Sequence, residues 1–511
     1  MKNQQLLIAI LFAVLSLLIN LVVTRNYHVG VSADSVNYIQ AAKTFSAGYE
    51  PVNTEGKLIT HAPPLYPISL AVFCKLIGTD ILNGADYFSA LLIALSIFIA
   101  SLICIKLGFS TSAIILINLF LLLSPAFIDV FRMLWSETLF IFLLLSAVYC
   151  LYKWMDTNSL WLIILSGILS GMCLLTRYAG IGLVGGIFLY LLFGSKKSVK
   201  SRITISAVYG LFTALVFGGW VFLLLKNPSG STNQGLVIHP VSKEHLIALM
   251  GTIGKWLSPS FLPGMILVAC TFIYLLVRIL QKKTGLLQAY RRQEYQLLIY
   301  MIAAYFIFLV CSISLVFFST PLDNRILSPI YPLCVILAVP FADQVKRINP
   351  RLGYGLATMM LLIYAGSFYF KTRDFLKEGR EFTGKVWTTS SLLRSLRVPD
   401  STEVYSNGED ILAFWKPGIV RYQILPLRED PNTNLLVDNF SAEMNKLKDS
   451  VRSGKAIVVN FDNITYRFYY AQKDELIRFF SDCCRINHYP DGIVISAARQ
   501  NAQDSPKTIR N

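Results

Sequence analysis

Long uninterrupted apolar segments recur through the first 370 residues of this 511-residue chain. Many of them are close to 20 residues long, and a helix of that length spans the hydrocarbon core of a lipid bilayer. The composition agrees, because 54% of the residues are hydrophobic and only 15% are charged, against roughly 25% charged residues in soluble domains. These features exclude an ordinary soluble enzyme, a disordered chain and a disulfide-rich scaffold, and they predict a polytopic membrane protein.

We expect a membrane bundle of about eleven transmembrane helices. The run 6–23 has no small-residue cleavage site after it, so it is predicted to remain as the first membrane helix. The run 65–77 is apolar but too short to cross, which predicts an interfacial or re-entrant helix. The expected spans are 5–24, 87–107, 110–128, 134–152, 160–176, 179–194, 203–225, 261–280, 295–318, 326–342 and 352–370.

Basic residues gather in three short loops that follow the sixth, eighth and tenth expected spans. They are Lys196, Lys197, Lys200 and Arg202; Arg278, Lys282, Lys283, Arg291 and Arg292; and Lys346, Arg347 and Arg351. Cytoplasmic loops of membrane proteins carry an excess of Lys and Arg, so these loops and the N-terminus are predicted to be cytoplasmic. Topology therefore accounts for the net charge of +16, and we expect no nucleic-acid partner.

The composition changes after Lys371, where charges become frequent and short strand-like and helix-like segments alternate. We therefore divide the chain into a membrane domain, 1–370, and an extracytoplasmic α/β domain, 371–511. Its strands are expected at Glu403–Ser406, Arg421–Leu425 and Ala456–Phe461, and its helices at Ser441–Arg452 and Asp474–Phe480.

A set of charged or titratable residues lies at span ends or in short apolar surroundings, and the predicted topology puts all of them at the outer face. They are Asp34, His61, Arg132, Glu137, Arg177, Asp323 and Arg325. Charged groups are costly within a membrane, so their collection at one face predicts a functional site. Ordinary interfacial anchoring, including a pair between Arg132 and Glu137, is the alternative explanation.

Asp34 falls in the first turn of a predicted helix with Ser32 as its N-cap and Tyr38 on the same face. An acid there complements the helix dipole, and it is also suited to act as a general base. His61 precedes three prolines in residues 63–67, which form either a stiff surface turn or a rigid support that presents His61 beside Asp34. Asp34 and His61 are also the two candidate ligands of a divalent metal, whose involvement stays open because no ligand-spacing motif is present.

Arg325 stands at the outer end of an apolar segment and is followed by Pro329 and Pro332. The planar guanidinium, with its fork of donors, suits a phosphate at the level of the lipid headgroups. Arg177 closes another span and is a second candidate for the same role.

At these positions the chain resembles the GT-C superfamily of membrane glycosyltransferases, which includes protein O-mannosyltransferases and lipid A aminoarabinose transferases. The resemblance covers roughly residues 5–345. It rests on four motifs: Asp34 with Tyr38, Ala41 and Ala42; Pro-Pro-Leu-Tyr-Pro at 63–67; Ser136-Glu137; and Arg325, Leu327, Ser328-Pro329 and Pro332. The chain departs from many relatives at Ser35, where they have a second acid, and from the aminoarabinose transferases at His61-Ala62, where they have Lys before the double proline.

The resemblance implies transfer of a sugar from a polyprenyl-phosphate donor to a glycan, lipid or protein acceptor, with inversion, at the outer face of a bacterial cytoplasmic membrane. Asp34 is then the catalytic base, and the substrate-binding residues are Tyr38, His61, Glu137, Arg177 and Arg325. The alternatives are a transporter or flippase, whose charges should lie near the membrane midplane, a non-catalytic polysaccharide-assembly protein, and a ligase for preassembled glycans.

Overall fold

The computed structural model describes residues 2–54, 56–60, 62–226, 240–257, 286–315, 320–399, 402–419, 421–429, 436–464 and 469–498, with isolated residues between 266 and 277. The chain divides into two compact units, Met1–Thr383 and Gly384–Asn511, called here the membrane unit and the C-terminal unit. The expected boundary after residue 370 falls within the last long helix of the membrane unit, α17 (Pro350–Glu378).

The described part of the membrane unit is built almost entirely of helices. In chain order they are α1 (Lys2–Thr24), α2 (Ala33–Ser46), α3 (Leu65–Ile77), α4 (Ile81–Lys106), α5 (Thr111–Leu123), α6 (Pro125–Phe131), α7 (Glu137–Thr157), α8 (Leu160–Leu174), α9 (Gly180–Leu189), η1 (Tyr190–Gly194), α10 (Val199–Lys226), α11 (Lys243–Leu257), α13 (Leu286–Tyr290), α14 (Gln293–Leu315), α15 (Asn324–Leu327), η3 (Ser328–Ile330), α16 (Tyr331–Ile348) and α17.

Among the described residues, seven helices are long and apolar enough to cross a membrane, or eight if the bent pair α5–α6 forms one span. The expected count of about eleven is therefore not confirmed. Three further apolar helices, Leu65–Ile77, Leu160–Leu174 and Gly180–Gly194, are shorter than a full span, and most of the expected span 261–280 lies outside the described residues. The multi-pass character of the protein is confirmed.

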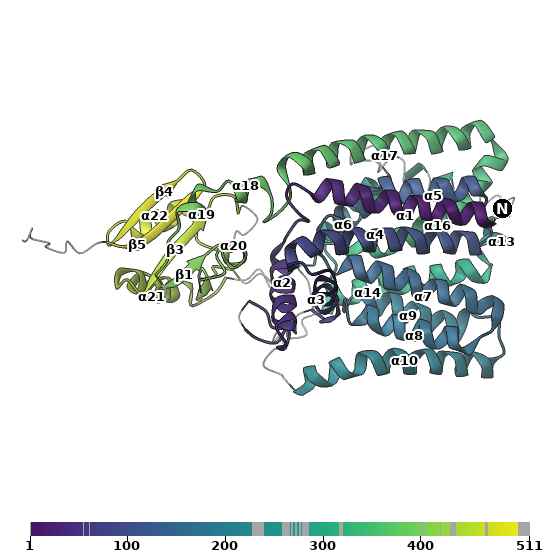
Figure 1. Cartoon of the computed structure of the whole chain (residues 1–511), viewed down its shortest axis with the longest axis horizontal. Coiled ribbons are helices and arrows are strands. Elements are labelled where there is room, and N and C mark those ends of the chain that lie inside the picture. The colour runs from purple at the N-terminus through teal and green to yellow at the C-terminus, as the bar shows by residue number, and fades with distance from the viewer. Residues whose placement is uncertain are drawn as a thin grey trace, which may run out of the picture. The chain divides into compact units, whose positions relative to one another are not determined.

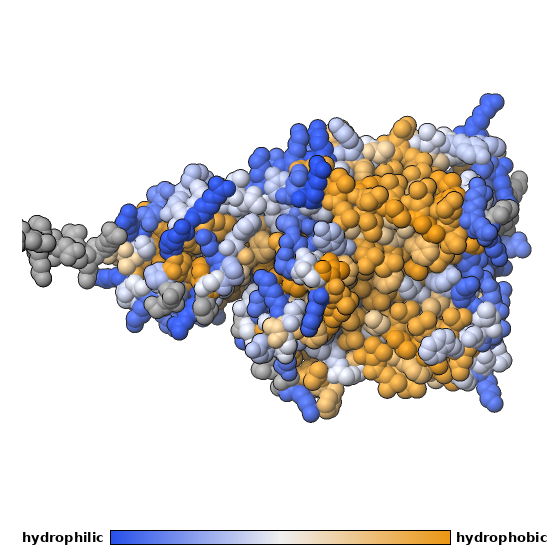
Figure 2. All heavy atoms as spheres, in the orientation of Figure 1, coloured by the Kyte–Doolittle hydropathy of each residue, from blue (hydrophilic) through white to orange (hydrophobic). Residues whose placement is uncertain are grey.

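Helices of the membrane unit run side by side and give it two distinct ends (Figure 1). The N-terminus, α13 and the turn from α16 to α17 lie at one end, whereas α2 and α3 lie at the other (Figure 1). Figure 2 shows an apolar band across this unit between two hydrophilic ends, as expected where lipid tails surround the helices. Arg291 and Arg292, which follow α13, and the basic residues between α16 and α17 thus lie at the end opposite α2 (Figure 1).

Small residues allow α8 and α10 to approach closely. A Cβ at Gly167 would lie 2.8 Å from the backbone oxygen of Tyr209, and one at Gly171 would lie 2.6 Å from Val216 Cβ. The Tyr209 hydroxyl donates to Ser170 Oγ at 2.7 Å across this contact. Glycines four residues apart with interhelical hydrogen bonds are a recurrent means of helix association in lipid.

The C-terminal unit contains a five-stranded sheet of order β2-β1-β3-β5-β4. Strands β1, β2 and β3 are parallel neighbours, and β5 pairs antiparallel with both β3 and β4. Its elements are α18 (Lys385–Thr388), α19 (Ser391–Ser395), β1 (Glu403–Ser406), α20 (Glu409–Trp415), β2 (Tyr422–Ile424), α21 (Phe440–Arg452), β3 (Ala456–Phe461), α22 (Lys473–Phe480), β4 (Cys484–Tyr489) and β5 (Gly492–Ala497).

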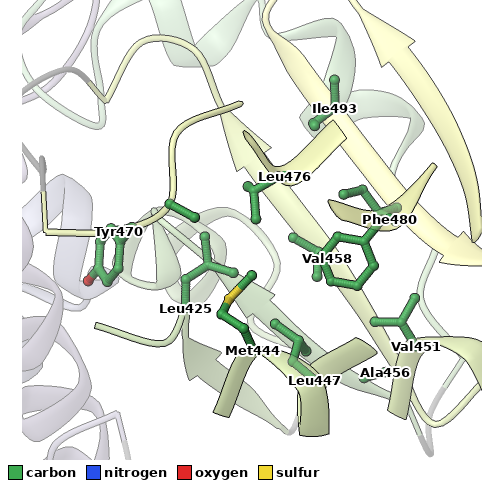
Figure 3. Close-up of a cluster of buried hydrophobic side chains, with 12 residues drawn as sticks. Leu425, Met444, Leu447, Val451, Ala456, Val458, Tyr470, Leu476, Phe480 and Ile493 are labelled. Carbon is green, nitrogen blue, oxygen red and sulfur yellow. The ribbon is translucent and has the colours of Figure 1, made fainter. Parts of the chain in front are cut away.

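Helices α21 and α22 cover one face of this sheet and form its core with alternate strand residues. Val458 and Ile493 point toward Leu447, Leu476 and Phe480 (Figure 3). The three strands and two helices expected from the sequence in this region are confirmed, with small shifts of their ends. The hairpin β4–β5 was not predicted.

Candidate active site

A short extended segment after α1 connects two parts of the chain that lie about a hundred residues apart. Gly30 donates its N–H to Arg132 O at 2.8 Å and accepts from Leu134 N at 2.9 Å. The contact is close, because a Cβ at Gly30 would lie 2.4 Å from Met133 Sδ and would displace that side chain. The start of α2 is thereby fixed beside the start of α7.

Polar side chains complete this connection. Ser35 Oγ donates to Leu134 O at 2.9 Å and accepts from Ser32 N at 3.0 Å. The indole N–H of Trp135 donates to Ser32 Oγ at 2.9 Å. Ser32 is the N-cap of α2 and Asp34 lies in its first turn, so the predicted helix start is confirmed.

Four charged side chains meet at this place and form the carboxylate–arginine cluster, defined as Asp34, Glu137, Arg177 and Arg325. Arg325 bridges the two acids, with Nη2 2.7 Å from Asp34 Oδ2 and Nε 2.5 Å from Glu137 Oε1. Arg177 forms a second ion pair with the same Glu137 oxygen. The side chain of Glu137 is 0% exposed and that of Asp34 is 42% exposed, so the cluster reaches from the protein interior to a surface open to other molecules.

The Tyr38 hydroxyl lies beside the cluster. It is 3.2 Å from Ser136 Oγ, which also accepts from Arg177 Nη1 at 3.3 Å. Burial, together with the negative charges of Asp34 and Glu137, raises the pKa of Tyr38 to about 12. Tyr38 is therefore neutral near pH 7 and can act as a hydrogen-bond donor.

Arg325 is held in place by its own local structure. The Trp135 ring lies under the guanidinium, with Cζ 4.8 Å from the ring centroid. Asp323 caps α15 by accepting from Ile326 N at 3.1 Å, and Asn324 Oδ1 accepts from the Trp256 indole at 2.8 Å. Burial raises the pKa of Asp323, while the hydrogen bond from Ile326 N lowers it.

The structure brings together five of the six residues predicted for the site: Asp34, Tyr38, Glu137, Arg177 and Arg325. The sixth, His61, lies outside the described residues. Arg132 lies elsewhere: it donates to Thr372 Oγ1 at 2.7 Å and stacks on Phe368 and Phe375. The alternative of an interfacial Arg132–Glu137 pair is wrong, since Glu137 pairs with the other two arginines.

Trp135 and Ser136 are contacts of the cluster that sequence reasoning did not assign. Trp135 contacts Arg325, and Ser136 joins Tyr38 to Arg177. Their position one and two residues before Glu137 was the available signal. The end of the turn between α6 and α7, together with the first residue of α7, therefore supplies three consecutive residues of the site.

Comparisons with known proteins identify the fold. Residues 61–220 match the family described as dolichyl-phosphate-mannose-protein mannosyltransferase. The structure of ArnT from Cupriavidus metallidurans bound to undecaprenyl phosphate is similar, with a TM-score of 0.61 and 14% identity over 96% of this chain and 99% of that one. The comparison with curated protein sequences finds no match.

The archaeal oligosaccharyltransferase AglB from Archaeoglobus fulgidus, in complex with an inhibitory peptide and a dolichol-phosphate, is also similar. Its TM-score is 0.58 at 11% identity, covering 99% of this chain and 75% of that one. The chain has the fold of the GT-C glycosyltransferases. The predicted resemblance is thus confirmed at the level of the fold, and the matched family and the similar structures are those of glycosyltransferases.

We expect Glu137→Gln to destabilise the protein strongly. Glutamine keeps the shape but removes the charge that compensates two arginines around a fully buried site. Breaking a buried ion pair in this way costs about 3–5 kcal/mol. The thermal unfolding midpoint of the detergent-solubilised protein measures the effect.

The matched control is Glu294→Gln, which removes a partly exposed pair with Arg292 at 3.4 Å. That change should cost about 0–1 kcal/mol. Equal midpoints for the two variants would show that Glu137 does not hold the cluster together.

Proposed function

We propose that the protein transfers a sugar from a polyprenyl-phosphate donor to an acceptor hydroxyl, with inversion, at the outer face of a bacterial cytoplasmic membrane. The observation that carries the proposal is the carboxylate–arginine cluster, in which an accessible acid and two arginines meet at one end of a membrane helix bundle. ArnT and AglB, which share the fold, were determined with undecaprenyl phosphate and a dolichol-phosphate respectively. A polyprenyl phosphate is therefore the donor carrier that we assign to this chain.

Asp34 is the general base in this proposal. The acceptor oxygen attacks the anomeric carbon as its proton passes to the Asp34 carboxylate, and the bond from that carbon to the phosphate oxygen breaks. The departing phosphate gains one negative charge. Arg325 and Arg177 counter that charge, which is the kind of fixed electrostatic stabilisation that lowers a transition state.

The ion pair between Asp34 and Arg325 couples the two events. Before reaction the two carboxylates balance the two arginines. When Asp34 accepts the proton it becomes neutral, and Arg325 loses one of its two anionic partners as the phosphate gains charge. Arg325 can then interact with the phosphate, and Asp34 is not left as an unpaired anion because it is now neutral.

Glu137 acts as a positioning residue in this scheme, because its side chain is fully buried. Tyr38 is a neutral donor beside the same cluster and is assigned to substrate binding. His61 keeps its predicted role in substrate binding as a proposal.

Asp34 and His61 were the two candidate ligands of a divalent metal, and His61 lies outside the described residues. No group of three or more His, Cys, Asp or Glu side chains converges in the part of the chain that the structure describes. Asp34, one of the two candidate ligands, is paired with Arg325, whose charge competes with a cation for the same carboxylate. We therefore derive no step through a metal.

A transporter remains the alternative from another functional class. Its charged residues should lie near the membrane midplane on broken helices. Here Asp34 and Arg325 lie in the first turns of α2 and α15, and Glu137 begins α7. Charges at helix ends favour the transferase.

We expect Asp34→Asn to lower turnover by about 10²–10⁴-fold, which is the usual contribution of a general base. The carboxamide keeps the position but cannot accept the proton. Donor binding should not weaken, because Arg325 then has one anionic partner fewer. Turnover and donor affinity are both measured, with Asp80→Asn as control, since Asp80 is the N-cap of α4 and Asn also caps helices. Turnover near the wild-type rate would reduce Asp34 to a helix-start residue.

We expect Arg325→Lys to weaken donor use substantially and Arg325→Ala nearly to abolish it, with both proteins still inserted. Lysine keeps the charge but cannot reproduce the two-pronged contact of Nε and Nη2. A simple interfacial anchor would tolerate lysine, which reaches the headgroups equally well. Donor binding and turnover are compared at equal expression with Arg380→Lys, an exposed arginine that pairs with Asp129 at 3.1 Å. Wild-type behaviour of Arg325→Lys with normal donor binding by Arg325→Ala would move the phosphate role to Arg177.

The topology is tested by a reporter fused after Glu378, the last residue of α17. Because the basic loops predict a cytoplasmic N-terminus and the expected span count is odd, a phosphatase that is active only after export should be active there. A reporter active only in the cytoplasm should be inactive at the same position. The opposite pattern would place the cluster on the wrong side for an exported donor.

A further inference from the structure

The C-terminal unit contains a cavity of about 340 Å³ on the sheet face that α21 and α22 leave open. Ile457 and Val494, which line it, alternate along their strands with core residues such as Val458 and Ile495. The wall beside this floor is formed by Ser395, Leu396, Arg397, Pro399 and Thr402. The volume is at the lower end of the range for small-ligand sites.

The wall is fixed to the sheet by Asp491 in the β4–β5 turn. Asp491 Oδ1 accepts from Ser391 Oγ at 2.6 Å and from Leu392 N at 3.1 Å, and its other oxygen accepts from Ser390. Burial alone would raise the pKa of Asp491, but these hydrogen bonds hold it below its ordinary value. The carboxylate is ionised near neutral pH, and its hydrogen bonds hold the segment that leads into the wall against the β4–β5 turn.

The lining combines an apolar floor with polar groups. Ile457 and Val494 are buried and form the floor, and Tyr489 adds an aromatic side chain. Asn487 and Ser496 supply amide and hydroxyl groups. Apolar and aromatic surface suits the C–H face of a sugar ring, and the polar groups suit its hydroxyls.

The cavity also has a positive charge at its edge. Arg397 lines it, and its Nη1 donates to the carbonyls of Arg394 and Leu396 at 3.1 and 3.3 Å. Arg397 forms no ion pair with an acid in the described part of the chain. Burial and the charge of Arg397 together lower the pKa of Lys416, so the two cations repel each other. An anionic ligand would relieve this repulsion.

We propose that this cavity binds one sugar unit that carries a carboxylate or phosphate group and belongs to the acceptor. Its role as an acceptor site rests on the proposed transferase function, whereas the binding itself does not. The C-terminal unit then selects the acceptor while the membrane unit performs the transfer.

Binding is measured by saturation-transfer NMR on the full chain in nanodiscs with three probes: D-glucuronate, glucose 6-phosphate and glucose. We expect both acidic sugars to bind more tightly than glucose. Their relative affinities show whether carboxylate or phosphate is preferred. Arg397→Ala should weaken the acidic sugars about tenfold, since a charge-assisted contact is lost, and leave glucose unchanged. Ser496→Phe should abolish all three by filling the cavity.

Arg452→Ala is the matched control, because Arg452 is an exposed arginine on α21, which covers the opposite face of the sheet. Asp34→Asn should keep full binding of the acidic sugars while losing transfer. A wild-type protein that binds the acidic sugars but transfers no sugar would reject the proposed function and leave this site intact. The inference is overturned if the acidic sugars bind no better than glucose, or if Arg397→Ala binds all probes as the wild type does.

Discussion

The buried carboxylate of Glu137 is the interaction on which the geometry of the site depends. An ionised group without exposure is tolerated only when it is paired and hydrogen-bonded, and Glu137 meets this condition through Arg177 and Arg325. These arginines follow α8 and begin α15, so one carboxylate fixes two distant segments against α7. Arg325 in turn positions Asp34, which makes the accessible acid dependent on the inaccessible one.

The sequence was sufficient for the membrane class, for most apolar segments and for the residues that gather at one end of the bundle. Apolar length and charge placement are local properties, and both are read directly from the chain. The span count was less predictable. The segments Leu160–Leu174 and Gly180–Gly194 are apolar but shorter than a full span, and α5 and α6 are bent by 53° at Ser124.

The partners within the site could not be derived from the sequence. Arg132 stands five residues before Glu137, but α6 ends at Phe131 and the turn directs Arg132 to Thr372 and two aromatic rings of α17. In the C-terminal unit, β4 was missed because Cys-Arg-Ile-Asn-His-Tyr lacks the apolar run of a central strand. As an edge strand it needs none, and Pro490-Asp491-Gly492 was the turn signal that could have indicated the hairpin.

The two carboxylates of the cluster differ in environment, and this difference decides which of them suits proton transfer. Glu137 is sealed from solvent and compensates two arginines, so protonating it would leave both guanidinium groups short of a partner. Asp34 is partly exposed and pairs with Arg325. When Asp34 is protonated, Arg325 still has its ion pair with Glu137. Protonation of Asp34 thus leaves the ion pairs between Glu137 and its two arginines intact, and it removes one of the two anionic partners of Arg325.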